Sequence, residues 1–331
     1  MKRFVKSKEM VILLIIVAIS AIISINNSTF LRPDNLIDML KGNTVLAIMA
    51  MGMLLAILTG GIDVSVSAII AAVTMVVGRF MITFTGNVVM AFVIGCLFGA
   101  LLGAINGVLI AKLKIPPIVV TLGTMSIING LLLYYTNGTL INGIPAEFVN
   151  FGKITLFNIP NGQDGTIGFP VQALFLIAAV VMTWILLKFT LIGRGIYAIG
   201  GNPTSAARIG YNLEKINIFI YTYIGFMTGL AGVVHTSIMR QVDPNAFAGF
   251  EMQVIAAVVL GGANILGGAG TVLGTLLGVV LLAIMNNGLI LMHIPVFWQK
   301  IIVGLVIIIA VSIDVIQRKH AEKNLTKVDI E

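Results

Sequence analysis

Long apolar runs alternate with short polar or glycine-rich segments along the whole chain. An α-helix needs about 20 apolar residues to cross the hydrocarbon core of a bilayer, and ten runs approach or exceed that length. We therefore expect an all-α polytopic membrane protein with about ten transmembrane helices, in which residues 1–331 form a single transmembrane domain. The ten runs are Met10–Ile25, Thr44–Thr59, Val64–Phe84, Val88–Ala111, Ile118–Tyr135, Val171–Leu187, Ile216–Met239, Met252–Leu266, Thr271–Ile290 and Val296–Val315.

The composition supports a membrane protein and excludes several other classes. Hydrophobic residues make up 58% of the 331 residues and charged residues only 10%, whereas soluble domains contain about 25% charged residues. The formal net charge is +7, but the basic residues are scattered between the apolar runs and form no face for nucleic acid. The single cysteine, Cys96, cannot build a disulfide framework or a cysteine-based metal site.

The distribution of Lys and Arg predicts the orientation of the chain, because these residues concentrate in cytoplasmic segments. With a cytoplasmic N-terminus, fourteen of them fall in inner segments and five in outer segments, while Arg79 lies within a run. Both termini are therefore expected in the cytoplasm, as tails at residues 1–9 and 317–331. The basic start followed by Met10–Ile25 is also similar to a signal peptide, but the run is long and no small-x-small cleavage site follows, so we interpret it as an uncleaved first span.

Two glycine pairs interrupt the apolar pattern, in the motifs Gly60-Gly61-Ile62-Asp63 and Gly261-Gly262-Ala263-Asn264. A glycine weakens a helix by about 1 kcal/mol relative to Ala, and a carboxylate at membrane depth costs about 2.5 kcal/mol or more. A plain membrane span would be expected to lack both. The pattern therefore predicts broken helices, with half-helices or re-entrant pieces beside the breaks, that shape a pathway through the protein.

An internal repeat is indicated because related motifs occur in the same order in both halves. Besides the glycine pairs, Ile105–Ile110 matches Asn286–Ile290. Repeated halves with glycine-interrupted segments indicate a transport site. Neutral amides suit a neutral polyhydroxylated solute, and no span carries a string of acids for proton or sodium coupling. Asp63 could cap the helix that begins at Val64 or contact the solute, and both alternatives stay open. The predicted pathway residues are Gly60, Gly61, Asp63, Ser65, Asn106, Gly261, Gly262, Asn264 and Asn286.

Two longer segments lie outside the predicted spans. Residues 137–170 form an outer loop, which is either a passive connector or a docking surface, since it is longer than most loops. The inner segment 194–215 encodes a short helix at Pro203–Ile209, with Asn202 as N-cap and Gly210 as its stop. Such a helix is marginal on its own in water, so we expect it to pack against another element.

Glycines at Gly95, Gly99 and Gly103 repeat at a spacing of four residues, which predicts that their helix packs closely against another. Motifs for chemistry are missing from the sequence. It contains no G-x-x-x-x-G-K-[ST] phosphate loop, no zinc motif and no credible nucleophile triad. We therefore expect no catalytic residues and no metal site, and nothing in the sequence indicates an enzyme.

The motifs together resemble a known family. The stretch Leu58–Ser67, Gly200-Gly201-Asn202 followed by Ala206-Ala207-Arg208, and Ile255–Gly262 followed by Gly267-Gly268-Ala269-Gly270 are similar to those of ABC sugar permeases of the ribose, xylose, arabinose and autoinducer-2 type. The similarity runs from about Phe30 to Ile316. The chain departs from the commoner form at Ser67, where that family often has a glycine.

This resemblance implies a permease subunit of an ATP-driven importer in the bacterial plasma (inner) membrane. Two permease copies, identical or related, would form the pore, with a cytoplasmic ATPase dimer and an extracytoplasmic solute-binding protein. The chain itself would hold no cofactor, and ATP and Mg would bind the ATPase. The implied ATPase-coupling residues are Gly201, Asn202, Ala206, Ala207, Arg208 and Gly210. The candidate residues for docking the binding protein, in the outer loop and the 240–251 segment, are Glu147, Arg240, Asp243 and Glu251.

The function implied is import of a simple sugar: a ribose-like pentose, a hexose or autoinducer-2. The alternatives are an ABC permease for nucleosides or branched-chain amino acids, an ion-coupled secondary transporter, and a membrane scaffold that transports nothing. The lack of a string of acids within any span and the capped inner helix disfavour ion coupling. The sequence leaves open which solute is carried and whether the permease pair is a homodimer or a heterodimer.

Overall fold

A computed structural model describes residues 8–84, 86–160 and 165–295, together with residues 297, 298, 301, 302, 304, 305, 308 and 312. Most of the predicted tenth span, Val296–Val315, lies outside these residues, as do the C-terminal tail and most of the N-terminal tail. Twelve helices and one two-stranded sheet are described. The helices are α1 (Lys8–Asn26), α2 (Pro33–Leu58), α3 (Val66–Thr83), α4 (Val88–Leu113), α5 (Pro117–Thr136), α6 (Ala146–Phe151), α7 (Gln172–Phe189), α8 (Leu191–Gly201), α9 (Pro203–Arg208), α10 (Leu213–Met239), α11 (Phe250–Leu260) and α12 (Val272–Leu291).

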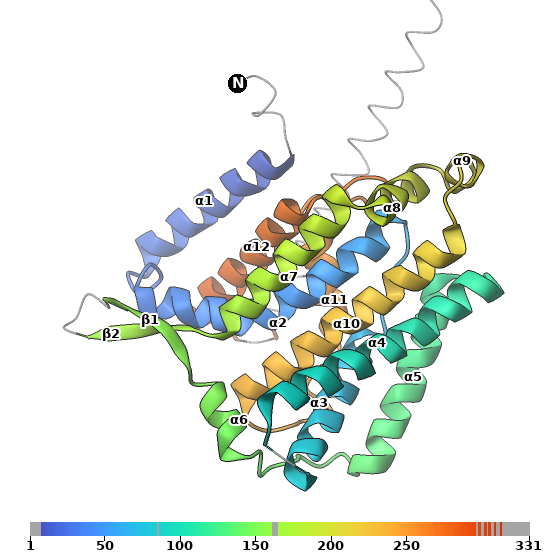
Figure 1. Cartoon of the computed structure of the whole chain (residues 1–331). Helices are drawn as coiled ribbons and strands as arrows, with labels where there is room; N and C mark the ends of the chain where they lie inside the picture. Colours follow the sequence, from blue (N-terminus) through green and yellow to red (C-terminus); the bar gives the residue numbers. More distant parts are fainter. Residues whose placement is uncertain are drawn as a thin grey trace, which may run out of the picture.

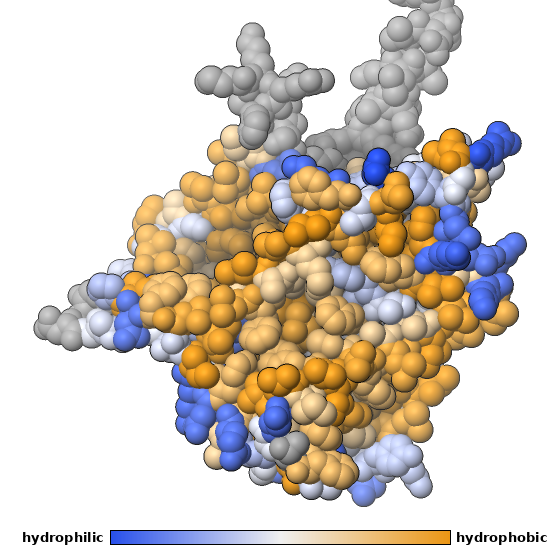
Figure 2. Space-filling view, in the orientation of Figure 1, coloured by the Kyte–Doolittle hydropathy of each residue, from blue (hydrophilic) through white to orange (hydrophobic). Residues whose placement is uncertain are grey.

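Eight of these helices are long and apolar enough to cross a membrane: α1, α2, α3, α4, α5, α7, α10 and α12. The prediction of a helical polytopic membrane protein is therefore confirmed. The predicted span Met252–Leu266 differs, because its helix α11 has only 11 residues and ends at Leu260. The glycine pair that follows stops the helix there. Hydrophobic side chains cover most of the face shown in Figure 2, and hydrophilic residues gather near its upper and lower ends.

Helices α2 and α10 form the centre of the bundle (Figure 1). In α2, 78% of the residues in the most apolar stretch are buried, and in α10 72% are buried, compared with 17% in α5. The α4–α10 contact is close, because glycines face one another across it. A Cβ atom at Gly99 would lie 2.9 Å from the Cα of Gly229, and one at Gly103 would lie 3.0 Å from the Cα of Gly225. The predicted close packing of the glycine-repeat helix is thus confirmed, with α10 as its partner.

The outer loop has structure of its own. It contains α6 and a hairpin of β1 (Thr155–Pro160) and β2 (Thr166–Pro170), which pair antiparallel. Ile141 and Val242 form a separate bridge, with amide-to-carbonyl distances of 2.9 and 3.0 Å, that ties the loop to the segment after α10. Helix α6 lies at one end of the bundle and α8 and α9 lie at the opposite end (Figure 1). Segments predicted on opposite sides of the membrane are therefore at opposite ends of the molecule.

Candidate functional site

The first helix break begins where α2 ends at Leu58. The amides of Gly60 and Gly61 donate to the carbonyls of Ile57 and Ala56, at 2.9 Å each. Gly60 has φ +78°, a left-handed conformation that favours glycine over residues with a side chain. Gly61 sits close to the Tyr221 hydroxyl, since a Cβ there would lie 2.7 Å from the tyrosine Oη. Both glycines therefore have a local structural reason to be at the break.

A buried polar cluster follows this break and leads into α3. The Asp63 Oδ1 accepts hydrogen bonds from the backbone amide of Ser65 at 2.9 Å and from the Ser65 hydroxyl at 2.6 Å. The Asn106 side-chain amide, from α4, donates to the same hydroxyl at 2.8 Å. Asp63 and Ser65 are 0% exposed and Asn106 is 1% exposed. Asp63 thus closes a two-residue turn with Ser65, the residue before α3, and is enclosed by protein.

Two acceptor oxygens in this cluster lack a donor. Asp63 Oδ2 and Asn106 Oδ1 are buried and make no hydrogen bond within the described residues. Both residues bond to the Ser65 hydroxyl, so the two unpartnered acceptors belong to one small network. Burying a polar group without a partner is costly. A neutral group at position 63 that kept an acceptor for Ser65 would therefore be less costly to bury than a charged carboxylate.

The second break, after α11, repeats part of this geometry. Gly262 has φ +86°. The Asn264 Oδ1 accepts from the backbone amide of Leu266 at 3.1 Å, which is the same two-residue turn that Asp63 makes with Ser65. The loop then returns through Gly267 and Gly268, both at positive φ, to α12. The two motifs that the sequence pairs therefore share this two-residue turn, but the positive φ falls on the first glycine of the first pair and on the second glycine of the second pair, and the second break is less buried.

The two breaks meet each other and the end of α8. The amide of Gly268 donates to the carbonyl of Leu58 at 2.9 Å. Gly200, near the end of α8, lies against both, because a Cβ there would be 2.5 Å from the Gly268 nitrogen and would also collide with the Leu58 carbonyl. The Tyr197 hydroxyl, one helical turn earlier, donates to the Gly270 carbonyl at 2.9 Å. We call Leu58–Gly61, Gly200 and Leu266–Gly270 the glycine junction.

Helix α9 follows directly from the glycine junction. The predicted short helix is confirmed: the Asn202 Oδ1 accepts from the Ser205 amide at 2.9 Å, and Gly210 has φ +97° after the helix ends. Ala206 is buried, and its carbonyl accepts from the Tyr211 amide at 3.1 Å. Ala207 and Arg208 are exposed. Of the coupling candidates in α9, Ala206 therefore packs against the protein, whereas Ala207 and Arg208 face outward, and α9 lies at the end of the bundle (Figure 1).

The docking candidates lie toward the opposite end, with different exposures. Glu147 lies in the first turn of α6 and is exposed, and Arg240 follows the last residue of α10 in a left-handed conformation and is also exposed. The Asp243 carboxylate accepts from the Asn245 amide at 2.8 Å and stays half-exposed. Glu251 differs from the other three, because it is only 6% exposed and its Oε2 has no hydrogen-bond partner among the described residues.

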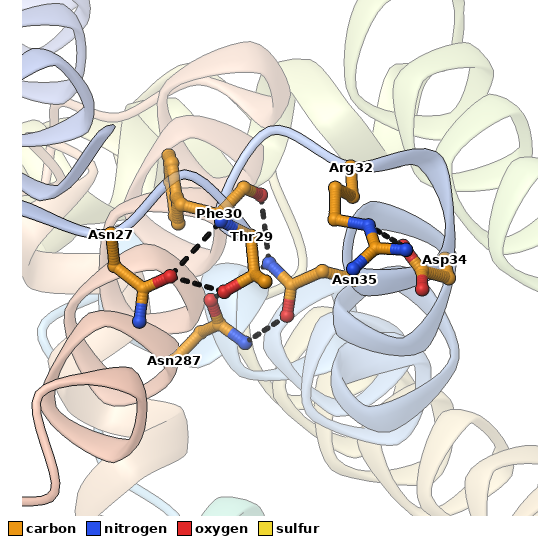
Figure 3. Close-up of polar contacts among 7 residues, drawn as sticks. All are labelled: Asn27, Thr29, Phe30, Arg32, Asp34, Asn35 and Asn287. Carbon is orange, nitrogen blue, oxygen red and sulfur yellow. Dashed lines mark hydrogen bonds and ion pairs between the residues drawn. The ribbon is translucent and has the colours of Figure 1, made fainter. Parts of the chain in front are cut away.

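Asn286 does not join the glycine junction, because it lies near the opposite end of α12. Its neighbour Asn287 makes the interhelical contact, exchanging hydrogen bonds of 3.0 and 2.7 Å with Asn35 of α2 (Figure 3). Asn27, in the turn between α1 and α2, adds a bond of 3.0 Å to the Leu291 carbonyl. Among the described residues no three His, Cys, Asp or Glu side chains gather as metal ligands would.

Sequence reasoning missed the parts that α8 contributes. Gly200 was visible only as a neighbour of Gly201 and Asn202, and Tyr197 carried no signal at all, because a tyrosine in an amphipathic helix is ordinary. Nothing in the sequence says that α8 touches both breaks. The site that the structure assembles is therefore a three-part backbone contact, and the sequence identified two of its three parts.

The family model that this chain matches and three of its relatives are all described as permease components of transport systems. Residues 35–311 match the family described as branched-chain amino acid transport system, permease component. The ribose import permease protein of Bacillus subtilis strain 168 is 40% identical over 88% of this chain and 88% of its own length. The D-allose transport system permease protein of Escherichia coli K12 is 34% identical over 92% and 89%. The autoinducer 2 import system permease protein of Photorhabdus laumondii is 33% identical over 98% and 94%. No solved structure matches the chain at a significant level.

Proposed function

The chain belongs to the family of permease components of branched-chain amino acid transport systems, and from its similarity to ribose, allose and autoinducer-2 permeases we propose that it carries a simple sugar: a ribose-like pentose, a hexose or autoinducer-2. The resemblance to ABC sugar permeases is confirmed, and the chain is a multi-pass transport subunit. Sugars are preferred over amino acids and nucleosides because ribose, allose and autoinducer-2 permeases resemble it over about nine-tenths of its length or more.

The observation that carries the mechanism is the contact of α8 with both helix breaks. An ATPase that binds ATP and Mg would bind α9 at Ala207 and Arg208, and its conformational change would displace α9. Because α9 is capped by Asn202, directly after α8, the motion would pass into α8. Gly200 and Tyr197 would then transmit it to the glycine junction, where the bond between Gly268 and Leu58 links the two breaks. Alternating access would follow from a shift of the helices that end there.

The proposed assembly has a cytoplasmic and an extracytoplasmic end. Residues 194–215 would face the ATPase subunits, since α9 lies at the end where α4 and α7 finish with Lys112 and Lys188. The outer loop 137–170, with Glu147, and the segment with Arg240 and Asp243 would face the solute-binding protein. Two permease copies would form the pore within one domain per chain, with both termini cytoplasmic and with related halves. The shared turn at Asp63 and Asn264 supports the repeat.

The test is transport by the assembled complex in vesicles. The permease, its ATPase and its binding protein are reconstituted, and uptake of labelled ribose, allose and autoinducer-2 is measured with and without internal ATP and with an ionophore. We expect uptake that requires ATP and survives the ionophore. Uptake that collapses with the ionophore would instead support an ion-coupled transporter, and preferential uptake of an amino acid or a nucleoside would replace the sugar assignment.

A further inference from the structure

A small pocket opens between α3, α5 and the segment that precedes α11. Its volume is about 230 Å³, and the residues that line it include Ser67, Asn129 and Asn245 on its polar side and Met125 and Phe247 on its apolar side. Pockets for drug-sized ligands occupy roughly 300–1,000 Å³. This pocket is smaller and suits a solute of about one sugar ring.

The polar side chains of the pocket have hydrogen-bonding capacity to spare. The side-chain amides of Asn129 and Asn245 make no hydrogen bond to other described residues. The Ser67 hydroxyl makes one long bond, of 3.4 Å, to the Val64 carbonyl. Each amide offers two donors and one acceptor, and the hydroxyl offers a donor and an acceptor. Such mixed, uncharged groups match the hydroxyl groups of a sugar.

The apolar part of the pocket complements this polar part. Phe247 is only 4% exposed and is held edge-on against His235, with 4.6 Å between the ring centroids. A fixed aromatic ring beside hydrogen-bonding groups is the arrangement expected for a solute with C–H bonds on its faces and hydroxyls at its rim. A lipid tail would leave the two amides without partners, which is costly away from water.

We propose that this pocket is a low-affinity binding site for a neutral monosaccharide on the translocation pathway, with Asn129 and Ser67 as its hydrogen-bonding residues. The inference rests on the proposed sugar-import function and adds where in the permease the sugar binds. Ser67 is the second residue of α3 and follows the cluster of Asp63, Ser65 and Asn106, which is itself enclosed. The pathway therefore runs past this cluster, and the residues that meet the solute are its neighbours.

The first experiment measures access from water in the assembled complex. Cys96, the only cysteine, is replaced by Ser, and Asn129→Cys is compared with Ala68→Cys, which lies beside Ser67 but is only 1% exposed. A charged, membrane-impermeant thiol reagent is added to vesicles. We expect Asn129→Cys to be labelled and its uptake to fall, and Ala68→Cys to stay unlabelled. If Asn129→Cys stays unlabelled in a complex that transports, the pocket is not on the pathway.

The second experiment measures selectivity. Asn129→Leu and Ser67→Ala are expected to lower sugar uptake about fivefold each, as for one lost hydrogen bond, and to change the ratio of pentose to hexose uptake. Ser126→Ala is the control, because this serine is exposed on the same helix and bonds only to the Leu122 carbonyl. If both pocket variants kept the uptake rate and the ratio of pentose to hexose uptake, the proposed binding site would be wrong, while the sugar-import function would stand. Absence of sugar uptake by the unmodified complex would instead overturn the proposed function.

Discussion

The amide of Gly268 donates a hydrogen bond of 2.9 Å to the carbonyl of Leu58, which joins two helix breaks that are more than half the chain apart in sequence. Leu58 is the last residue of α2, the most enclosed spanning helix, and Gly268 lies in the loop that leads into α12. Gly200 of α8 sits against both. The glycine junction is therefore a point where a small movement of α8 would reach two spans at once.

Replacing Gly200 with Ala should disturb this junction. The added methyl group would meet the Leu58 carbonyl and the Gly268 nitrogen, and overpacking of this kind costs about 1–3 kcal/mol. We expect a lower temperature of unfolding in detergent, and ATP hydrolysis that no longer drives uptake in vesicles. Gly201→Ala is the matched control for stability, because a Cβ at this adjacent glycine would have no neighbour within 4 Å. If both variants unfolded at the same temperature, the glycine junction would have to accommodate a methyl group at Gly200 without cost.

Asp63→Asn should be well tolerated, whereas Asp63→Ala should not. The asparagine Oδ1 can still accept from the amide and hydroxyl of Ser65, and the substitution removes an ionisable group from a site that is enclosed by protein. The alanine loses both hydrogen bonds to Ser65, at a cost of about 0.5–1.5 kcal/mol each. Thermal unfolding and vesicle uptake measure both variants. Loss of uptake in a stable Asp63→Asn complex would show that the carboxylate itself takes part in transport.

Arg208→Glu should leave membrane insertion intact but weaken binding of the ATPase and uptake. Arg208 is exposed at the end of α9, so reversing its charge removes no internal contact, while a charge pair with the partner would become a repulsion. Co-purification with the ATPase and ATP-dependent uptake are the measurements. Lys112→Glu, an equally exposed basic residue at the end of α4, is the control. Normal uptake by Arg208→Glu would contradict the coupling role of α9.

The Asn35–Asn287 pair should contribute measurably to stability. Truncating Asn287 to Ala leaves the Asn35 side chain without one of its amide partners across α2 and α12 (Figure 3). Interhelical hydrogen bonds in membrane proteins contribute about 0.6 kcal/mol on average and up to about 1.7 kcal/mol. A double-mutant cycle of Asn35→Ala and Asn287→Ala, followed by unfolding in detergent, measures the coupling. Asn286→Ala is the control, since the Asn286 side chain makes no hydrogen bond to the described residues. An equal loss of stability in this variant would argue against the Asn35–Asn287 pair.

Much of the fold was predictable because a long apolar run is stable chiefly as a helix that crosses a membrane. The two glycine pairs located the helix breaks, and the Asn202, Pro203 and Gly210 pattern located α9 almost to the residue. These features are local, since hydrophobic length, capping and positive φ depend on neighbours in the chain. The eighth predicted span, Met252–Leu266, was wrong in length because Gly261 and Gly262 end α11 after 11 residues, although Ile265 and Leu266 beyond them are apolar.

What the sequence determined by itself was the membrane class, the positions of the breaks, the glycine repeat of α4 and the short capped helix α9. Only the tertiary structure decided which surfaces these features meet: that Gly99 and Gly103 pack on Gly225 and Gly229, that Asp63 is enclosed, and that the breaks join at Gly200. The physical reason is that backbone contacts between glycines leave no side-chain pattern to read. A glycine in the sequence indicates that another part of the backbone packs closely against it, and only the folded chain shows which part that is.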